Sequence, residues 1–181
     1  MKKQMSKSLQ RGFSMIELML ALVVIGVLAG SIFYIYNSLT ASAKTENEIS
    51  GINGMAANIR RAWKSSSDFS ALSTSTMITR KAVPEKMING TKLMNTWSGD
   101  VTVTPSGPDG GAGTNAWKIT YNLVPVEACL DLVSGVQTAF SAIKVGGTAV
   151  KTTTTPFNQS QAVTSCSPAD GNPVSVEMVG I

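Results

Sequence analysis

The residues best suited to chemistry are Gly12 to Glu17, which read GFSMIE where a basic stretch meets a long apolar one. The basic stretch contains no acid and carries four cations, Lys2, Lys3, Lys7 and Arg11. If the peptide bond between Gly12 and Phe13 is cut, a new positive amine appears four residues before Glu17. Because one amine can neutralise one carboxylate, such a cut would give Glu17 a charge partner.

The apolar stretch is long enough to cross a membrane. Leu18 to Tyr36 contains about 19 residues without a charge, and a helix of that length spans roughly 28 Å. Upstream basic residues hold the N-terminus in the cytoplasm, which places everything after Tyr36 on the other side. We therefore expect an exported domain carried on one N-terminal membrane helix.

Glu17 is the unusual residue, because it lies at the start of this apolar run. A carboxylate costs a few kcal/mol at the bilayer centre, and such residues usually have a partner. The sequence offers no nearby basic residue that could follow Glu17 into the membrane. Glu17 either reaches toward the lipid headgroups and does nothing more, or pairs with an amine from elsewhere.

The residues GFSMIEL resemble the cleavage motif of type IV prepilins. That motif has a glycine closing a short basic leader, an apolar first mature residue, and a glutamate four residues on. In that family an inner-membrane prepilin peptidase cuts after the glycine and methylates the new amine, and the glutamate pairs with the first residue of a neighbouring subunit. The resemblance implies removal of residues 1–12 by a cut between Gly12 and Phe13, N-methylation of Phe13, and an assembly role for Phe13 and Glu17.

A second cleavage site competes with the first. Ala41, Ser42 and Ala43 form an A-x-A of the type that secretory signal peptidases use, which would release a soluble domain starting at Lys44. The apolar run exceeds the usual 7 to 15 residues of a signal core and has Glu17 near its start, which favours the prepilin interpretation. Translation could begin at Met1 or at Met5.

Composition excludes several functions. Without its leader the chain has 11 basic and 11 acidic residues, so the basic pI reflects the leader and predicts no nucleic-acid contact. Arg60, Arg61 and Lys64 are interpreted as a solvated helix end. The chain has no histidine, its acids are scattered, and no phosphate-binding loop follows a strand. We therefore expect no catalytic, cofactor-binding or metal-binding residues, and a protein that is not an enzyme.

A long helix from Phe13 to Lys64 is predicted, with residues 13–36 apolar on all sides and residues 37–64 amphipathic. Within the first half, Gly26 and Gly30 have the spacing that lets helices approach closely in a bilayer, and they also weaken the helix, so it could melt there inside a filament. The second half carries an apolar stripe at three- and four-residue spacing that requires a sheet to cover it: Ile49, Ile52, Met55, Ala56, Ile59, Ala62 and Trp63.

Residues 65–181 are predicted to form a globular head with an antiparallel sheet, which makes the fold class α+β. Residues 65–100 read as an irregular linking loop with a short helix near Pro84 to Met87. Val101 to Thr104 and Trp117 to Leu123 alternate as strands, and Pro105 to Gly113 between them reads as the flexible tip of a hairpin.

The C-terminal part of the head combines one helix with further strands. Val126 to Phe140 has helical periodicity that Gly135 weakens. Ala142 to Val150 is interpreted as a strand with Gly146 and Gly147 as a turn or bulge, and Pro173 to Val179 as the closing strand. Thr152 to Ser165 is expected to be an exposed loop that could hold binding specificity.

Cys129 and Cys166 are the only cysteines. In an exported chain an even count suggests a disulfide, and only one intramolecular pairing is possible. It would close a loop of about 38 residues and stabilise the fold by roughly 3 to 4 kcal/mol. Two free buried thiols are the alternative. The placement is similar to the C-terminal disulfide region of type IV pilins, and the helix entering Cys129 looks most like the type IVb branch. Phe13 as first mature residue and the short leader fit the type IVa branch better.

Three functional classes follow from the resemblance and its competitor. A major pilin would sit in the inner membrane as precursor, meet the prepilin peptidase and the assembly machinery, and form a homo-oligomeric helical filament outside the cell. A minor pilin or secretion pseudopilin would share the N-terminus. A soluble exported binding module would result from a cut after Ala43. Adhesion, aggregation, conjugation and motility all use such filaments, and the sequence does not choose among them.

Overall fold

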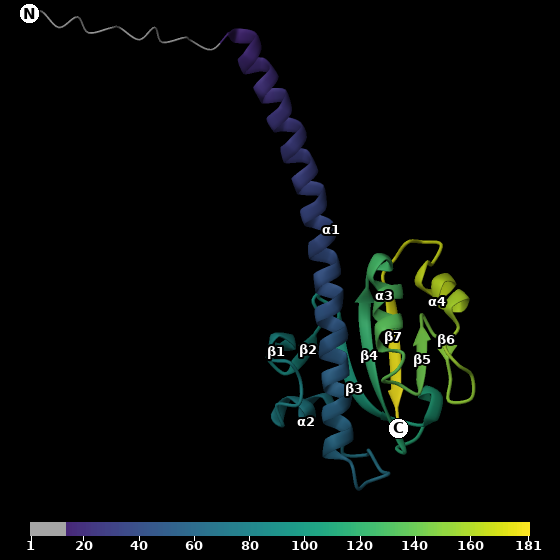
Figure 1. Cartoon of the computed structure of the whole chain (residues 1–181). Coiled ribbons are helices and arrows are strands. Elements are labelled where there is room, and N and C mark those ends of the chain that lie inside the picture. Colours follow the sequence, from purple (N-terminus) through teal and green to yellow (C-terminus); the bar gives the residue numbers. More distant parts are fainter. Residues whose placement is uncertain (1–13) are drawn as a thin grey trace, which may run out of the picture. The chain divides into compact units, whose positions relative to one another are not determined.

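The computed structural model describes residues 14–181, without the side chains of residues 33–39. The chain divides into a first compact unit that ends at Thr40 and a second unit, Ala41–Ile181. Helix α1, Met15–Ala62, is continuous and contributes to both units (Figure 1). It contains no proline and ends just before three consecutive serines, which compete for backbone hydrogen bonds. The long helix is therefore confirmed over these residues, with its end two residues before the predicted one.

Within the second unit, the predicted apolar stripe of α1 forms part of the core. Its central residues, Ile52, Met55, Ala56 and Ile59, are fully buried. Ile49 and Trp63 are partly buried against the same core. Ala62 is an exception to the prediction, because it is exposed and lines an open cleft. The reason is that Ala62 is the last helical residue and lies beyond the part of the helix that the core covers.

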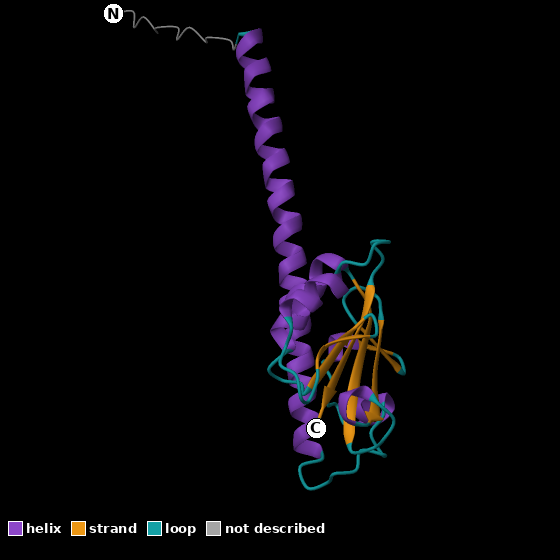
Figure 2. Cartoon of the chain, turned by 90° about the vertical axis from the view of Figure 1, so that its right-hand side faces the viewer, coloured by secondary structure: helices purple, strands orange, loops and turns teal. Residues whose placement is uncertain are grey.

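A seven-stranded sheet covers the stripe, in the order β1-β2-β3-β4-β7-β5-β6, and neighbouring strands are all antiparallel. Figure 2 shows the second-unit part of α1 beside one face of this sheet. The last strand lies between β4 and β5, so it completes the sheet at its centre. The strands are β1 Ile88–Asn89, β2 Lys92–Met94, β3 Asp100–Ser106, β4 Ala116–Val124, β5 Ala142–Val145, β6 Thr148–Lys151 and β7 Val174–Gly180.

The predicted β3–β4 hairpin is confirmed, with Val101 opposite Tyr121 and Ser106 opposite Ala116. Its tip is not the free loop that the glycine-rich sequence suggested. A short 3-10 helix, η2 (Pro108–Gly110), forms there. The Asp109 carboxylate accepts hydrogen bonds from the backbone N–H and hydroxyl of Thr153, at 2.7 and 2.9 Å. Polar contacts with a distant segment therefore hold the tip, which the local sequence cannot reveal.

Helix α3, Val126–Val136, connects β4 to β5 and is four residues shorter than predicted. After Val136 the chain turns, and Phe140 packs edge-on against Trp117 with ring centroids 5.5 Å apart. Phe140 therefore belongs to the core beneath the sheet and not to the helix. Residues 142–150 form the hairpin β5–β6, and of the turn or bulge predicted at Gly146 and Gly147 the turn is confirmed. Both glycines have positive φ, as a tight hairpin turn requires.

Three short helices complete the second unit. The 3-10 helix η1, Glu85–Met87, lies where a short helix was predicted. Helix α2, Thr74–Thr79, begins at the capping residue Ser73 and buries Met77. Its residues, TSTMIT, have no apolar periodicity from which a helix could be predicted. Helix α4, Gln159–Cys166, replaces the second half of the loop expected at residues 152–165. Asn158 caps α4 and two buried side chains hold it, which is too little apolar content for a sequence-based prediction.

Gly180 makes the closest backbone approach to the aromatic core. It pairs with Trp117 across β4 and β7, and a Cβ atom at Gly180 would lie 2.1 Å from the Trp117 ring. Trp117 itself is fully buried, so its ring has no free space to enter. Only a residue without a side chain fits at this position.

We expect Gly180→Ala to lower the free energy of unfolding by about 1 to 3 kcal/mol, because the added methyl overpacks a rigid core. Thermal unfolding of the detergent-purified chain, followed by near-ultraviolet circular dichroism, measures this. Gly54→Ala is the matched control, since a Cβ there meets nothing within 4 Å and gains up to about 1 kcal/mol of helix propensity. Equal melting temperatures for the two variants would contradict the packing argument.

Candidate functional site

Glu17 lies in the first turn of α1. The backbone N–H groups of Glu17 and Leu18 donate to the Ser14 carbonyl at 3.0 and 3.1 Å, which starts the helix. A carboxylate at a helix N-terminus is stabilised by the positive end of the helix dipole. The cleavage residues Gly12 and Phe13, with the rest of the leader, lie outside the described residues.

Apolar side chains surround Glu17 along the helix. Met15, Leu18 and Met19 are exposed by 79, 58 and 60% respectively. Among the residues that the structure describes, Glu17 forms no ion pair, and the next cation in the sequence is Lys44. A cation for this carboxylate therefore has to come from outside residues 14–43.

The segment Met15–Ile32 is an 18-residue helix with a mean hydropathy of 2.4 and no buried residue. By length and composition it can cross a membrane, since it spans roughly 27 Å. Gly26 and Gly30 lie within it, and a Cβ at either position would meet nothing within 4 Å. The helix is continuous through both glycines. Close helix packing at this pair and melting in a filament stay predictions, because one copy of the chain tests neither.

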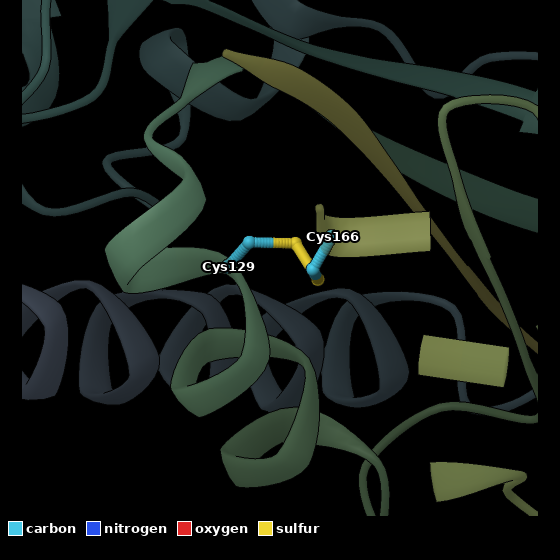
Figure 3. The surroundings of a disulfide bond; sticks show 2 residues. All are labelled: Cys129 and Cys166. Atoms are coloured by element: carbon cyan, nitrogen blue, oxygen red, sulfur yellow. A yellow bond between two sulfur atoms is a disulfide. The ribbon is translucent and has the colours of Figure 1, made fainter. Parts of the chain in front are cut away.

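The predicted pairing of the two cysteines is confirmed. Cys129 on α3 and Cys166 at the end of α4 form a disulfide, with Cα atoms 5.6 Å apart (Figure 3). Both residues are buried, with exposures of 0 and 2%. The bond joins the two C-terminal helices across the β5–β6 hairpin and excludes the alternative of two free thiols.

A buried carboxylate in the second unit was missed from the sequence. Glu48 on α1 is only 2% exposed. It accepts hydrogen bonds from the Thr96 backbone N–H at 3.1 Å and from the Tyr121 hydroxyl at 3.2 Å. Burial raises the pKa of Glu48, because loss of solvent outweighs these bonds. Burial and the Glu48 charge raise the pKa of Tyr121 well above its ordinary value, so its hydroxyl stays a donor.

Glu48 joins three parts of the second unit: α1, strand β4 and the loop before β3. Its position could have been recognised, because it lies four residues before Ile52 and eight before Ala56, on the buried face of the helix. A charge on an apolar stripe is costly unless it is hydrogen-bonded. The two donors meet that requirement.

The basic end of α1 is less solvated than predicted. Arg60 is exposed, but its guanidinium stacks 5.6 Å from the Trp117 ring centroid and donates to the Ala139 carbonyl. The composition could not reveal this, because Trp117 and Ala139 come from distant parts of the chain. Arg61 and Lys64 are exposed as expected.

Comparison with known proteins brings these features together. Residues 7–33 match a family model described as the prokaryotic N-terminal methylation motif. Residues 42–178, well over half of the chain, match a second model described as PilS N terminal. The chain belongs to this family and is a type IV pilin. The N-terminal resemblance and the disulfide-containing second unit thus agree on one family.

Solved pilins share the fold. With a type IV b pilin from Salmonella typhi, this pilin has a TM-score of 0.57 and 23% identity, covering 74% of this chain and 97% of the other. With TcpA, a type IV pilin from Vibrio cholerae El Tor biotype, the TM-score is 0.57 and the identity 13%, covering 77% and 99%. In its α+β fold the pilin is therefore similar to both, and the first is a type IVb pilin, the branch that the helix entering Cys129 suggested.

Two curated relatives come from Escherichia coli, strains O127:H6 and O111:H-. Each is a major structural subunit of the bundle-forming pilus. The pilin is 23% identical to each over 134 residues, which is 73% of this chain and 68% of the relative.

The raised pKa of Glu48 predicts how pH affects stability. A group whose pKa is higher in the folded state contributes stability below its ordinary value of 4.5, and this contribution is lost as pH rises through the folded value. We expect the stability of the wild type, measured relative to Glu48→Gln, to fall as the pH rises above 4.5. Thermal unfolding of both purified chains across that range measures the difference.

A second variant separates charge from hydrogen bonding. Glu48→Ala leaves the Thr96 N–H without an acceptor and the Tyr121 hydroxyl with only the Met87 sulfur, 3.7 Å away, so it should cost about 1 to 3 kcal/mol, even at neutral pH. If the stabilities of the wild type and Glu48→Gln changed in parallel with pH, burial would not raise the pKa of the Glu48 carboxylate as described.

Proposed function

We propose that this pilin is the major structural subunit of a type IV pilus. The prepilin peptidase cuts between Gly12 and Phe13 and methylates the Phe13 amine. The precursor and the mature monomer sit in the inner membrane through the apolar half of α1. The assembly machinery then adds subunits to an extracellular homo-oligomeric filament, in which Glu17 pairs with the Phe13 amine of a neighbouring copy.

The observation that carries this proposal is the setting of Glu17 in the first turn of a fully exposed apolar helix. Such a surface is not stable in water, so lipid covers it before assembly and other copies cover it afterwards. The carboxylate needs a cation from outside residues 14–43. A new N-terminal amine four residues away on a neighbouring copy supplies that cation without any additional basic residue.

The role of major subunit is supported by the curated relatives. Both are major structural subunits, and the similarity extends over 68% of their length. A minor pilin would share the N-terminus, so abundance distinguishes the two roles. The major subunit dominates fibres that are sheared from the cell surface, whereas a minor component is scarce there.

The mature N-terminus provides the first test of processing. Intact-mass and peptide analysis of surface fibres should find a chain that begins at N-methylated Phe13. This outcome is expected because the leader cations, the glycine and Glu17 have the spacing that the peptidase recognises. A mature chain that begins at Lys44 would instead establish signal-peptidase cleavage and remove the apolar helix from the product.

Glu17→Ala tests assembly. Without the carboxylate, the amine of the incoming copy loses its partner, so we expect filaments to decrease by at least roughly tenfold while export and cleavage continue. Sheared-fibre yield and immunoblots of the processed chain measure the two steps separately. Glu46→Ala, which removes an exposed acid of the same helix, should leave the yield unchanged. Normal fibre levels in Glu17→Ala would refute the charge-pair role.

A further inference from the structure

A basic cleft opens at the C-terminal end of α1. It has a volume of about 420 Å³, and its cations are Arg61, Arg80 and Lys81. Ala62 and Ala82 supply a small apolar surface between them. All three cations are exposed, and no acid lines the cleft.

A stacking contact and a left-handed backbone position the cations of the cleft. The Arg80 guanidinium stacks 5.2 Å from the centroid of the Trp63 ring, which fixes one cation at the rim. Lys81 has a φ of 51°, a left-handed backbone that is uncommon for a residue with a side chain. Among the described residues, none of the three cations has an ion-pair partner within 4 Å. The mature chain is formally neutral, so the balancing acids must lie elsewhere on its surface.

An acidic surface, opposite in charge to the cleft, lies at the junction of β4 and α3. Leu123 is 52% exposed and has a φ of 55°, at an irregularity in the pairing of β4 with β7. Glu127 and Asp131 follow on α3, both exposed and four residues apart, so they share one face of the helix. An exposed leucine in a left-handed conformation, next to two acids, is unusual for a surface without a partner.

The two surfaces lie at opposite ends of the second unit. Arg60, next to the cleft residue Arg61, stacks on Trp117 near the start of β4. Leu123 lies near the end of the same strand, which is about 20 Å away at roughly 3.3 Å per residue. Figure 1 shows the same arrangement, with the C-terminal end of α1 and the start of α3 at opposite ends of the sheet.

We propose that the basic cleft of one pilin copy binds Leu123, Glu127 and Asp131 of the next copy. The leucine would contact the apolar surface of the cleft, and the acids would face its three cations. Because the two surfaces differ and lie at opposite ends, the contact is head-to-tail and leads to an open filament. The inference rests on the proposed polymerisation and names the surfaces that align successive subunits. Complementary charge at the rim fixes their register.

Zero-length carbodiimide cross-linking of intact sheared filaments tests the contact directly. It joins a lysine amine to a carboxylate only when the two touch. We expect a cross-linked peptide between Lys81 and Glu127 or Asp131. The roughly 20 Å from Trp117 to Leu123 along β4 separates the cleft from Glu127 in the first turn of α3, so a Lys81–Glu127 product joins two copies. Filaments that yield other lysine–carboxylate links but none between Lys81 and these acids would overturn the proposal.

Charge reversal tests whether the contact contributes to assembly. Arg61→Glu with Lys81→Glu should lower the sheared-fibre yield roughly tenfold, because like charges then face each other. Adding Glu127→Lys and Asp131→Lys to that chain should restore the yield. Lys92→Glu is the control, because this exposed cation lies outside the cleft and should leave the yield unchanged.

The remaining outcomes of charge reversal are equally decisive. An unchanged fibre yield in the cleft variant, or a loss that the reversed acids do not rescue, would overturn the proposal. A cleft variant that keeps its fibre yield but no longer binds a polyanion such as DNA would also overturn the proposal, because it would assign the cleft to another partner. If Glu17→Ala abolishes filaments while the cleft variants do not, the proposed function stands and only this inference fails.

Discussion

Helix α1 has to be stable in two different surroundings, and the rest of the pilin follows from that constraint. Over Met15–Ile32 its side chains, apart from Glu17 and Ser31, are apolar on every side, and none is buried within the chain. Over the second unit only one stripe is apolar, and the sheet buries it. A continuous helix satisfies its own backbone hydrogen bonds, so it tolerates both surroundings without unpaired polar groups. Only the side chains need to change along its length.

The covered half of α1 explains the arrangement of the sheet. Four fully buried residues of the helix, Ile52, Met55, Ala56 and Ile59, need an apolar surface opposite them. The central strands β4 and β7 provide it with Ile119, Tyr121, Val176 and Met178, all fully buried. Because β7 is the last strand, the chain must be nearly complete before the centre of the sheet can form. The disulfide between α3 and α4 then joins the segments that bring β7 into place.

Features that depend on local pattern were predictable from the sequence. The helical stripe, the β3–β4 hairpin and β7 follow from residue periodicity, and the cysteine pairing follows from their number. Features that depend on distant contacts were not. Helix α4 has only two buried side chains, and the hairpin tip is held by Asp109 and Thr153, which are 44 residues apart. Phe140 leaves its helical pattern to pack on Trp117.

In the candidate site, too, local pattern was predictable and distant contacts were not. The motif predicts what happens to Gly12, Phe13 and Glu17, because short spacings carry that chemistry. The partner of Glu17 is not visible in one copy, since the carboxylate has no cation within residues 14–43. Glu48 was missed although its spacing placed it on the buried face. Its donors, Thr96 and Tyr121, are 48 and 73 residues away, and no local pattern identifies them.

Net charge links processing to assembly in physical terms. The full sequence carries a formal charge of +4, and all of that excess lies in residues 1–12, the proposed leader, whose cations would orient the membrane helix. Removal of the leader leaves equal numbers of acidic and basic residues. Copies of a neutral chain approach one another without long-range repulsion, so the positions of individual charges decide how they align. A chain that kept its leader would lack both the free Phe13 amine and this neutrality. The proposed cut would therefore create the amine for Glu17 and allow the charges of the second unit to direct packing.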